Sequence, residues 1–338
     1  MPFTLMVALA LGAPDAGHYT NPLRVSVADP CVLRQGNVYY LYGTYGPDTH
    51  RGVTVHTSTD LVHWERKGLA FERRKNTWSQ THFWGAEVVP RGHGYLMFYT
   101  TSPETDPDAP LNMYLAVAEG DSPLGPFREL RAPLFQPPPG KQAIDQNVFV
   151  DDGGQAYLYF TFVEPGRNVI YGAPLSEDLL SLRRKPVPCI APEAAWESRP
   201  WEGHRVTEGA HVLKHKGTYY LFYTGNHFLD PHYAIGYATA DNPLGPWARY
   251  PGNPVLTRTE HIAGPGNGAP VLSPDGTEWF MVYHVHESTE AVGIRQLALD
   301  RFRFVAQEMG PDRIEMTGPT HTPQLLPSGT HEDKSMAD

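Results

Sequence analysis

The sequence contains few cysteines. Its only two, Cys31 and Cys189, stand 158 residues apart. Such a distant pair excludes a disulfide framework and the closely spaced cysteines of a structural zinc site. One bridge between them is conceivable, but two unbridged thiols are the preferred interpretation. Cys31 lies in an apolar run, which favours a packing role over a reactive one.

Basic residues are also scarce. The chain has 27 Lys and Arg against 37 Asp and Glu, for a net charge of −10, and its basic runs do not exceed three residues. A nucleic-acid partner is therefore not expected, because binding to nucleic acid depends on neutralising phosphates. Aromatic residues make up 12% of the chain. Aromatics and acids with few bases suit a neutral polyhydroxy ligand such as an oligosaccharide or polysaccharide.

Long apolar runs are missing, so no membrane partner is expected. Residues 3–12 are apolar but too short to cross a bilayer. They resemble the apolar region of a signal peptide, with Ala8-Leu9-Ala10 as a cleavage-like sequence, although the basic segment that normally precedes it is absent. We expect a secreted or periplasmic protein. The alternative is a cytoplasmic protein in which this segment forms a buried terminal strand.

One phrase occurs five times along the chain: a short apolar run, a glycine-containing turn and an aromatic strand. The aromatic strands end at equivalent positions, which are Thr44, Thr100, Thr161, Thr224 and His284. The steps between these positions are 56, 61, 63 and 60 residues. Repeats of this size, each reading as a few short strands, predict a β-propeller.

The predicted fold is therefore all-β, a single-domain five-bladed β-propeller over residues 18–310. Residues 1–17 are expected to be a signal-like or extended segment, and residues 311–338 a closing segment with a mobile tail. No appended domain and no helix longer than a turn or two are expected. Near-copies of one turn at 121–127 and 241–247, 120 residues apart, support the repeat independently.

Three acids open the apolar runs of the first, third and fourth repeats. Asp29 stands 15 residues before the strand end, and Asp145 and Glu208 each stand 16 before it. The matching places are Trp84 or Gly85 in the second repeat and Gly268 or Ala269 in the fifth. A single acid at this position is usually a loop residue. Three acids at the same position of five repeats that form a ring are instead expected to lie close together on the axis of the ring. Acids that close together have pKa values pushed apart, which supplies the base and the acid that cleave a glycosidic bond.

The ordered phrases Ala28-Asp29-Pro30, Trp84 to Glu87, Ile144-Asp145 and Thr207-Glu208-Gly209 resemble glycoside hydrolase family 43, as do the segments 18–22, 264–266 and 283–284. The resemblance covers most of residues 18–305. It implies a five-bladed propeller and an inverting mechanism on plant-type pentosides. It also implies that Asp29 is the general base, that Glu208 is the general acid, and that Asp145 tunes and orients the acid. The sequence departs from the family pattern in two places. It has Trp-Gly-Ala-Glu where the family has Trp-Ala-Pro-Glu, and it has Asn267 where the family usually has histidine.

Several other residues are candidates for binding substrate. Trp84 and Phe83 are predicted to stack on a sugar ring, with ordinary core packing as the alternative. His227, with Phe228 and His232, follows the aromatic strand of the fourth repeat and is expected near the rim. Arg295 resembles a family arginine that reaches the acids, although a lone strand arginine can equally be a solvated edge charge. Glu87 is expected to be structural.

His284 and His286 would point to the same face of a strand, which suits metal binding. The pair lacks the further ligands of a zinc site, however. The resemblance implies a hydrated, calcium-like structural ion on the propeller axis near His284, and a hydrogen-bonded core histidine is the alternative. No cofactor is expected to be required for the chemistry.

The predicted function is that of an exo-acting hydrolase that releases terminal α-L-arabinofuranosyl units. β-D-Xylosidase and endo-arabinanase activity are the alternatives within the family. Family β-xylosidases commonly carry a C-terminal β-sandwich for which this chain has no room, which favours arabinofuranosides. The alternative from another class is a non-catalytic carbohydrate-binding propeller, but it should have lost at least one acid. A retaining fructosidase is disfavoured by the Ala-Asp-Pro-Cys context of Asp29.

Overall fold

The computed structural model describes residues 17–330 apart from residue 198 and residues 200–202. The signal-like segment and the last eight residues of the predicted tail lie outside this part. Across the described residues the regular structure is β-strand, with two single-turn 3₁₀ helices, η1 (Gly46–Asp48) and η2 (Ala195–Glu197). This confirms the all-β class and the expected lack of long helices. None of the described helices is long and apolar enough to span a membrane.

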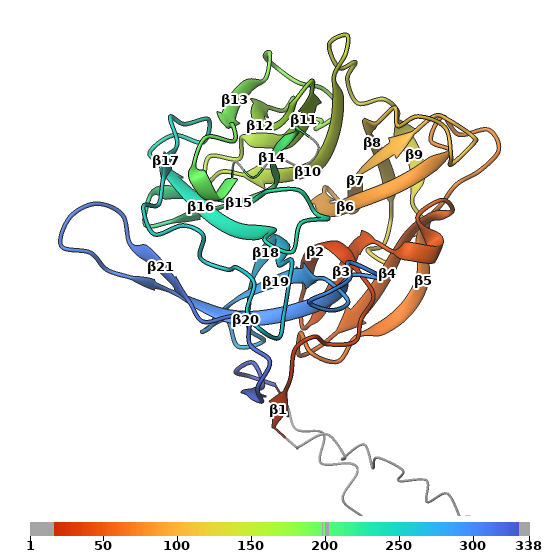
Figure 1. The fold of residues 1–338 in the computed structure, drawn as a ribbon. Coiled ribbons are helices and arrows are strands. Elements are labelled where there is room, and N and C mark those ends of the chain that lie inside the picture. Colours follow the sequence, from red (N-terminus) through yellow and green to blue (C-terminus); the bar gives the residue numbers. More distant parts are fainter. Residues whose placement is uncertain (1–16, 198, 200–202, 331–338) are drawn as a thin grey trace, which may run out of the picture.

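Antiparallel meanders of four strands build most of the described chain (Figure 1). Three meanders are separate sheets, whose strands are β2 (Ala28–Gln35), β3 (Val38–Thr44), β4 (Gly52–Ser58) and β5 (Glu65–Glu72); β6 (Thr81–Arg91), β7 (Gly94–Ser102), β8 (Tyr114–Gly120) and β9 (Arg128–Arg131); and β18 (Gly266–Leu272), β19 (Trp279–Val285), β20 (Gln296–Val305) and β21 (Arg313–Met316). The outermost strand of the last sheet, β21, thus lies beyond residue 310, where the sequence pattern ends.

The remaining strands form one eight-stranded sheet. Its strands are β10 (Gln142–Val150), β11 (Ala156–Glu164), β12 (Arg167–Pro174) and β13 (Val187–Ile190), followed by β14 (Arg205–His215), β15 (Thr218–Gly225), β16 (Ala234–Ala240) and β17 (Ala248–Arg249). Two antiparallel runs are joined here by a short parallel pairing of β12 with β14, at Arg167 with Arg205 and Asn168 with Val206. Each run has the same strand order as the separate sheets.

Local sequence explains the tight hairpins within the meanders. Between β14 and β15 the two turn residues, Lys216 and Gly217, have φ angles of 48° and 86°. Positive φ at both positions is the feature of the two-residue turn whose twist matches paired strands. The aromatic and β-branched residues that follow suit a pleated, buried strand, and Tyr220 to Tyr223 of β15 are fully buried.

The meanders pack side by side around a common centre (Figure 1). Their first strands touch in the order β2, β6, β10, β14 and β18, and β18 in turn contacts β2. Each of five hydrophobic clusters lies between consecutive meanders. In one of them Tyr39 and Leu41 of β3 pack with Phe280 and Val282 of β19, so the last meander packs on the first.

The two ends of the described chain meet beside the last sheet. Strand β1 (His18–Tyr19) pairs with β22 (Gln324–Leu325). Nearby, the Asn21 side chain donates to the Leu299 carbonyl and accepts from the Leu299 N–H, both at 2.9 Å. The lead-in that precedes the first meander is therefore fixed to β20.

The two near-copy turns make equivalent contacts. The Tyr42 hydroxyl of β3 donates to the Pro123 carbonyl of the first turn at 2.5 Å. Tyr159 of β11 donates in the same way to the Pro243 carbonyl of the second turn. In both cases a tyrosine of one meander is capped by the turn of the next, which gives the sequence similarity a structural reason.

Strand pairing confirms that the five predicted strand ends are equivalent. Thr44, Thr100, Thr161, Thr224 and His284 each pair with a residue just before a bulge in the first strand of the meander, namely Ala28, Trp84, Ile144, Glu208 and Gly266. The next residues, Asp29, Gly85, Asp145, Gly209 and Asn267, all have φ between 48° and 63°. Asp29 and Asp145 therefore share a position.

This register corrects two predicted placements. Glu208 lies one residue before the position that Asp29 and Asp145 share, and the fifth repeat places Asn267 there instead of Gly268 or Ala269. The hairpin turns between the first two strands differ in length among the meanders. Counting back a fixed number of residues from the strand ends therefore places the equivalent first-strand position one or two residues off in some repeats.

Candidate active site

The positive-φ residues are held in place by the meander that precedes each of them. Their backbone N–H groups donate to the side chain at the preceding strand end: Gly85 to Thr44 at 3.0 Å, Asp145 to Thr100 at 3.1 Å, Asn267 to Thr224 at 2.9 Å, and Asp29 to His284 Nδ1 at 3.1 Å. The third strand end differs, because the Gly209 N–H bonds the Asp145 carboxylate, and the buried Thr161 hydroxyl has no hydrogen-bond partner among the described residues. These bonds fix the backbone that carries Asp29 and Asp145.

The three predicted acids line one pocket of about 350 Å³. Its lining includes Asp29, Asp145, Glu208, Trp84, His227, Phe228, Arg295, Leu111, Met113, Gln142, Asn168, His204, Tyr233 and Asn267. Much of this wall is apolar or aromatic, with polar groups converging on the acids. That composition is typical of a small-molecule site.

Asp29 accepts hydrogen bonds from three side chains. Thr44 Oγ1 lies 2.7 Å from Oδ2, and Asn267 Nδ2 lies 2.7 Å from Oδ1. Arg295 Nη1 lies 3.2 Å from the same Oδ1 and forms an ion pair with it. Donors and a cation around a carboxylate orient its oxygens, and hydrogen bonds between ionised groups are the stronger ones. This is the environment that a general base requires.

Glu208 is buried, with two hydrogen-bond donors. Tyr233 donates to Oε1 at 2.7 Å and Asn168 to Oε2 at 3.1 Å. Burial and, to a lesser extent, the negative charge of Asp29 raise the pKa of Glu208 to about 7, against the two hydrogen bonds and Arg295, which lower it. A carboxyl group that keeps its proton near neutral pH can serve as a general acid.

Asp145 lies beside both of the other acids. Burial raises the pKa of its carboxyl group well above the usual value, and the charges of Glu208 and Asp29 add to the shift. A Cβ atom placed on Gly85 would lie 3.7 Å from Asp145 Oδ1 and 4.0 Å from Asp29 Cβ. A Cβ there would be in ordinary van der Waals contact with both acids, so what favours glycine between them is its φ of 51°.

The structure separates the two aromatic residues predicted to stack on sugar. Trp84 lines the pocket. Phe83 is fully buried and packs against Phe71 and Tyr99, with ring centroids 5.4 Å and 6.0 Å away. The prediction of a stacking role for Phe83 is wrong, because successive side chains of a strand point to opposite faces. Phe83 is a core residue.

Only some of the residues expected near the rim lie in the pocket wall. His227 and Phe228 line the pocket, and the Arg295 guanidinium lies 5.2 Å from the centre of the Phe228 ring. His232 instead lies against Asp230, with Nδ1 3.0 Å from its carboxylate, and is not part of the pocket wall. Arg295 thus connects the rim to Asp29.

Sequence reasoning missed several polar residues of the pocket, although the repeat contains a signal for them. The strand ends Thr161, Thr224 and His284 each pair with a residue in the third strand of their meander. Two residues before that pairing partner stands Asn168 in the third meander, Tyr233 in the fourth and Arg295 in the fifth. Met113 holds the same position in the second meander. All four line the pocket. This shared position could have identified Asn168 and Tyr233 together with Arg295.

His284 does not fit the role of a direct metal ligand. Its Nδ1 accepts the Asp29 N–H, and its Nε2 lies 3.4 Å from Arg295 Nη1, so both ring nitrogens face N–H groups of the protein. Burial and the charge of Arg295 lower the pKa of His284 well below its usual value. His286 Nε2 pairs with the Phe228 carbonyl at 2.8 Å. A calcium ion held through water on the axis stays a prediction, and none of the chemistry below depends on it.

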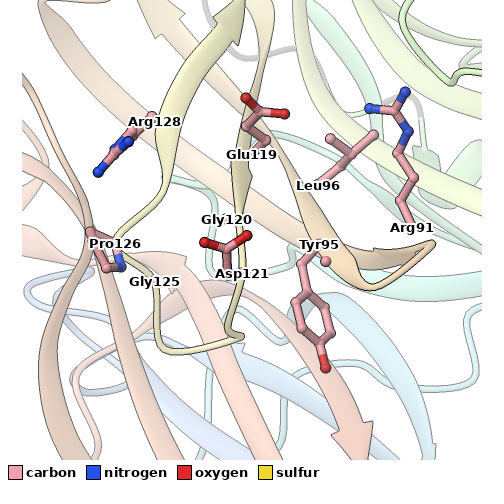
Figure 2. Close-up of a pocket in the computed structure, with 10 residues that line it drawn as sticks. Arg91, Tyr95, Leu96, Glu119, Gly120, Asp121, Gly125, Pro126 and Arg128 are labelled. Atoms are coloured by element: carbon pink, nitrogen blue, oxygen red, sulfur yellow. The ribbon is translucent and has the colours of Figure 1, made fainter.

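A larger surface pocket of about 590 Å³ lies away from the acids (Figure 2). It is formed around β7, β8 and the start of β9, and its charged residues Arg91, Glu119, Asp121 and Arg128 are of mixed sign. None of the predicted site residues lines it. The smaller pocket therefore holds the candidate chemistry.

Comparison with known proteins agrees with this site. The sequence model of "Glycosyl hydrolases family 43" matches residues 19–309. The chain belongs to glycoside hydrolase family 43. A crystal structure of a thermostable family-43 glycoside hydrolase is 37% identical, with a TM-score of 0.81 and coverage of 92% of this chain and 100% of that one.

Two curated relatives match over most of their length. A β-D-galactofuranosidase of Aspergillus niger is 27% identical over 307 residues, which is 86% of this chain and 84% of the relative. An extracellular exo-α-(1→5)-L-arabinofuranosidase of Streptomyces chartreusis is 27% identical over 308 residues, which is 86% of this chain and 89% of the relative. With the family shown, this protein is a glycoside hydrolase that acts on carbohydrate.

Proposed function

We propose that this family-43 enzyme is an inverting exo-α-L-arabinofuranosidase. The observation that carries the proposal is the difference between two carboxyl groups in one pocket. Asp29 is surrounded by three donors, whereas burial raises the pKa of Glu208 to about 7. One carboxyl group oriented as a hydrogen-bond acceptor and another that keeps its proton near neutral pH can serve as base and acid in one pocket. The names of the related enzymes support a pentosyl or furanosyl glycosidase.

The fold proposed with this function is a closed five-bladed β-propeller, in which each four-stranded meander is one blade. The circular order of contacts among β2, β6, β10, β14 and β18 supports it. So does the packing of the last meander on the first through a shared hydrophobic cluster. A closed ring of sheets protects their edges and brings all first strands to one axis, where the acids lie.

In the proposed reaction a water molecule attacks the anomeric carbon as the bond to the leaving oxygen breaks. Asp29 removes a proton from that water, and Glu208 donates its proton to the leaving oxygen. The new bond joins the water oxygen to the anomeric carbon, so the configuration inverts. Asp145 accepts a hydrogen bond from the Gly209 N–H and so holds the backbone next to Glu208, and Arg295 orients Asp29. The reaction uses these side chains and water alone.

The size and lining of the pocket support release of a terminal sugar. Its volume of about 350 Å³ is at the small end for ligand sites. Trp84 and Phe228 provide apolar faces, and Gln142, Asn168 and His204 provide polar groups for hydroxyls. A compact pocket with these groups suits one sugar ring better than a long polymer groove.

Secretion is proposed with the function. The Streptomyces chartreusis relative is named as extracellular, and arabinose-containing plant polysaccharides are themselves outside cells. The signal-like segment 3–12 of the sequence agrees with export.

A panel of nitrophenyl glycosides tests the proposed specificity. We expect the highest kcat/KM on the α-L-arabinofuranoside, with β-D-xyloside and β-D-galactofuranoside as the decisive comparisons. Preference for either of these would change the substrate and leave the acid–base assignment intact. Linear and branched arabino-oligosaccharides should lose single terminal units. Internal cleavage of arabinan with little free arabinose would instead indicate an endo-acting enzyme.

A further inference from the structure

A second ring of side chains lies just beyond the catalytic acids along the first strands. These residues follow the bulge in each first strand and pair with β3, β7, β11, β15 and β19; they are Cys31, Glu87, Asn147, His211 and Ala269. Because the five positions are equivalent, their side chains lie at the same depth around the centre. Four of the five are polar or metal-binding residue types.

Three members of this ring come close together. One potential ligand atom each from Cys31, Glu87 and His211 lies within 4.8 Å of the other two. Cys31 and Glu87 are buried, with exposed fractions of 7% and 6%. Metal ligands around a zinc ion stand about 2.0–2.3 Å from it. Three atoms within this mutual distance can therefore reach one ion with small side-chain movements.

Glu87 is a buried carboxyl group for which the described part of the chain provides no cation. Asn147 Nδ2 lies 3.1 Å and 3.3 Å from its two oxygens, and the Val148 N–H donates to Oε2 at 2.9 Å. None of the ion pairs among the described residues includes it. Burial raises the pKa of Glu87 to about 8. A buried carboxylate is costly unless a cation or a full set of donors compensates it.

Cys31 and His211 provide the other two ligand atoms of the site. The Cys31 thiol accepts a hydrogen bond from the Val88 N–H, and burial raises its pKa. The His211 ring makes no hydrogen bond with any residue that the structure describes, and burial lowers its pKa to about 4. A neutral imidazole is the form that binds metals. The ring is thus available as a ligand.

We propose that Cys31, Glu87 and His211 bind a divalent transition-metal ion, for which Zn²⁺ fits the ligand set best. Thiolate, imidazole and carboxylate together are zinc ligands, whereas calcium takes oxygen ligands almost exclusively. The site differs from the predicted calcium position near His284, whose Nδ1 is already bonded to Asp29. The ion would join β2, β6 and β14 across the axis, so its role is to stabilise the fold.

The fourth coordination position can be filled by water. A small cavity of about 30 Å³ is lined by Cys31 and His211, and also by Asp29 and Asp145. A water molecule occupies about this volume in the liquid. Three protein ligands with one water is a common arrangement for zinc. The cavity places that water between the metal site and the acids.

The first experiment measures metal content in the full-length, untagged protein. After incubation with Zn²⁺ and dialysis, elemental analysis should find one zinc per chain in the wild type and in the control Cys189→Ser, whose thiol lies outside the cluster. Cys31→Ser and His211→Gln should each retain less than a tenth of that amount. Zinc at equal stoichiometry in wild type and in folded Cys31→Ser would overturn the proposal, as would calcium without zinc.

A second experiment uses cobalt to report the ligands directly. Co²⁺ loaded into the wild type and into Cys189→Ser should give a near-ultraviolet thiolate charge-transfer band, which Cys31→Ser should lack. Addition of Zn²⁺ should raise the Tm of wild type and not that of His211→Gln, by mass action on the folded state. If Cys31→Ser does not fold, the His211→Gln variant still tests the proposal, because it keeps the Cys31 thiol and loses only the imidazole ligand. No band and no shift in the wild type would overturn the proposal and show that the three side chains pack together without binding a metal.

Discussion

Asn267 Nδ2 donates a 2.7 Å hydrogen bond to Asp29 Oδ1. The Oδ1 atom of the same Asn267 side chain lies 3.1 Å from the Tyr233 hydroxyl, whose single proton points between it and Glu208, 2.7 Å away. One amide therefore connects the proposed base to the proposed acid through a single tyrosine. The family usually has histidine at this position, and in this chain an asparagine provides one donor and one acceptor at fixed orientation. The relation suggests that base and acid are positioned as a pair.

The first prediction concerns the two carboxyl groups themselves. Asp29→Ala and Glu208→Ala should each reduce kcat by at least about 10²-fold, since positioned acid and base groups contribute that much or more. The loss of kcat in Glu208→Ala should be smallest on substrates with acidic phenol leaving groups, because these leaving groups need little protonation. Asp29→Ala should lose activity on all leaving groups alike. Near-wild-type turnover of either folded, purified variant would remove the assignment.

A pH profile tests the bond between Tyr233 and Glu208. Glu208 acts when protonated, so kcat/KM of the wild type should fall as pH rises through about 7. The Tyr233 hydroxyl stabilises the charged form of Glu208 and thereby lowers its pKa. In Tyr233→Phe the pKa of Glu208 should rise, and the alkaline limb should move upward by about one to two pH units, since hydrogen bonds to charged groups contribute roughly 1.5–3 kcal/mol.

Tyr219→Phe is the matched control for this measurement. Its hydroxyl also donates to a carboxylate, Asp151 at 2.7 Å, but outside the pocket. Its pH profile should overlay that of the wild type. An unchanged limb in Tyr233→Phe, or a shift to lower pH, would mean that the limb reports a group other than Glu208.

Trp84 and Phe83 should give opposite results when each is changed to alanine. Trp84→Ala removes part of the pocket wall, so KM should rise by about tenfold or more while Tm stays close to that of the wild type. Phe83→Ala removes a fully buried ring and should lower the free energy of unfolding by about 3–5 kcal/mol. Steady-state kinetics and denaturant unfolding measure the two effects. A raised KM without lost stability in Phe83→Ala would contradict its assignment to the core.

The repeat explains why much of the fold could be predicted from sequence. A strand with aromatic residues on both faces, ended by threonine or histidine, recurs because four of the five ends accept a backbone hydrogen bond from the next meander, as Thr44 does from Gly85. Such periodic contacts leave a periodic trace in the sequence. The same trace located Asp29, Asp145 and Glu208, which the structure brings into one pocket.

What the sequence did not predict depends on bulges and loops. The positive φ of Asp29 and of Gly209 is not visible in residue types alone, so the offset of Glu208 by one residue was missed. Asn168 lies at the start of the third strand β12 and Tyr233 directly before the third strand β16, and the number of residues between the first strand and these positions varies with loop length. Phe83 and Trp84 are adjacent aromatics, and only the strand register decides which one faces the pocket.

The last prediction is stereochemical and follows from where the acids are attached. Asp29 comes from β2 of the first meander and Glu208 from β14 of the fourth, so the two approach the pocket from different sides of the centre. Inverting enzymes hold their carboxyl groups roughly 6.5–9.5 Å apart to leave room for a water, whereas retaining enzymes need about 5–5.5 Å. We expect inversion, because Asp29 is bonded to Thr44, Asn267 and Arg295 as an oriented base. Proton NMR of the first-formed sugar, before mutarotation, should show the anomer opposite to that of the substrate. Retention of configuration, or transfer of the sugar to added methanol, would indicate a covalent intermediate and would make Asp29 a nucleophile instead of a base.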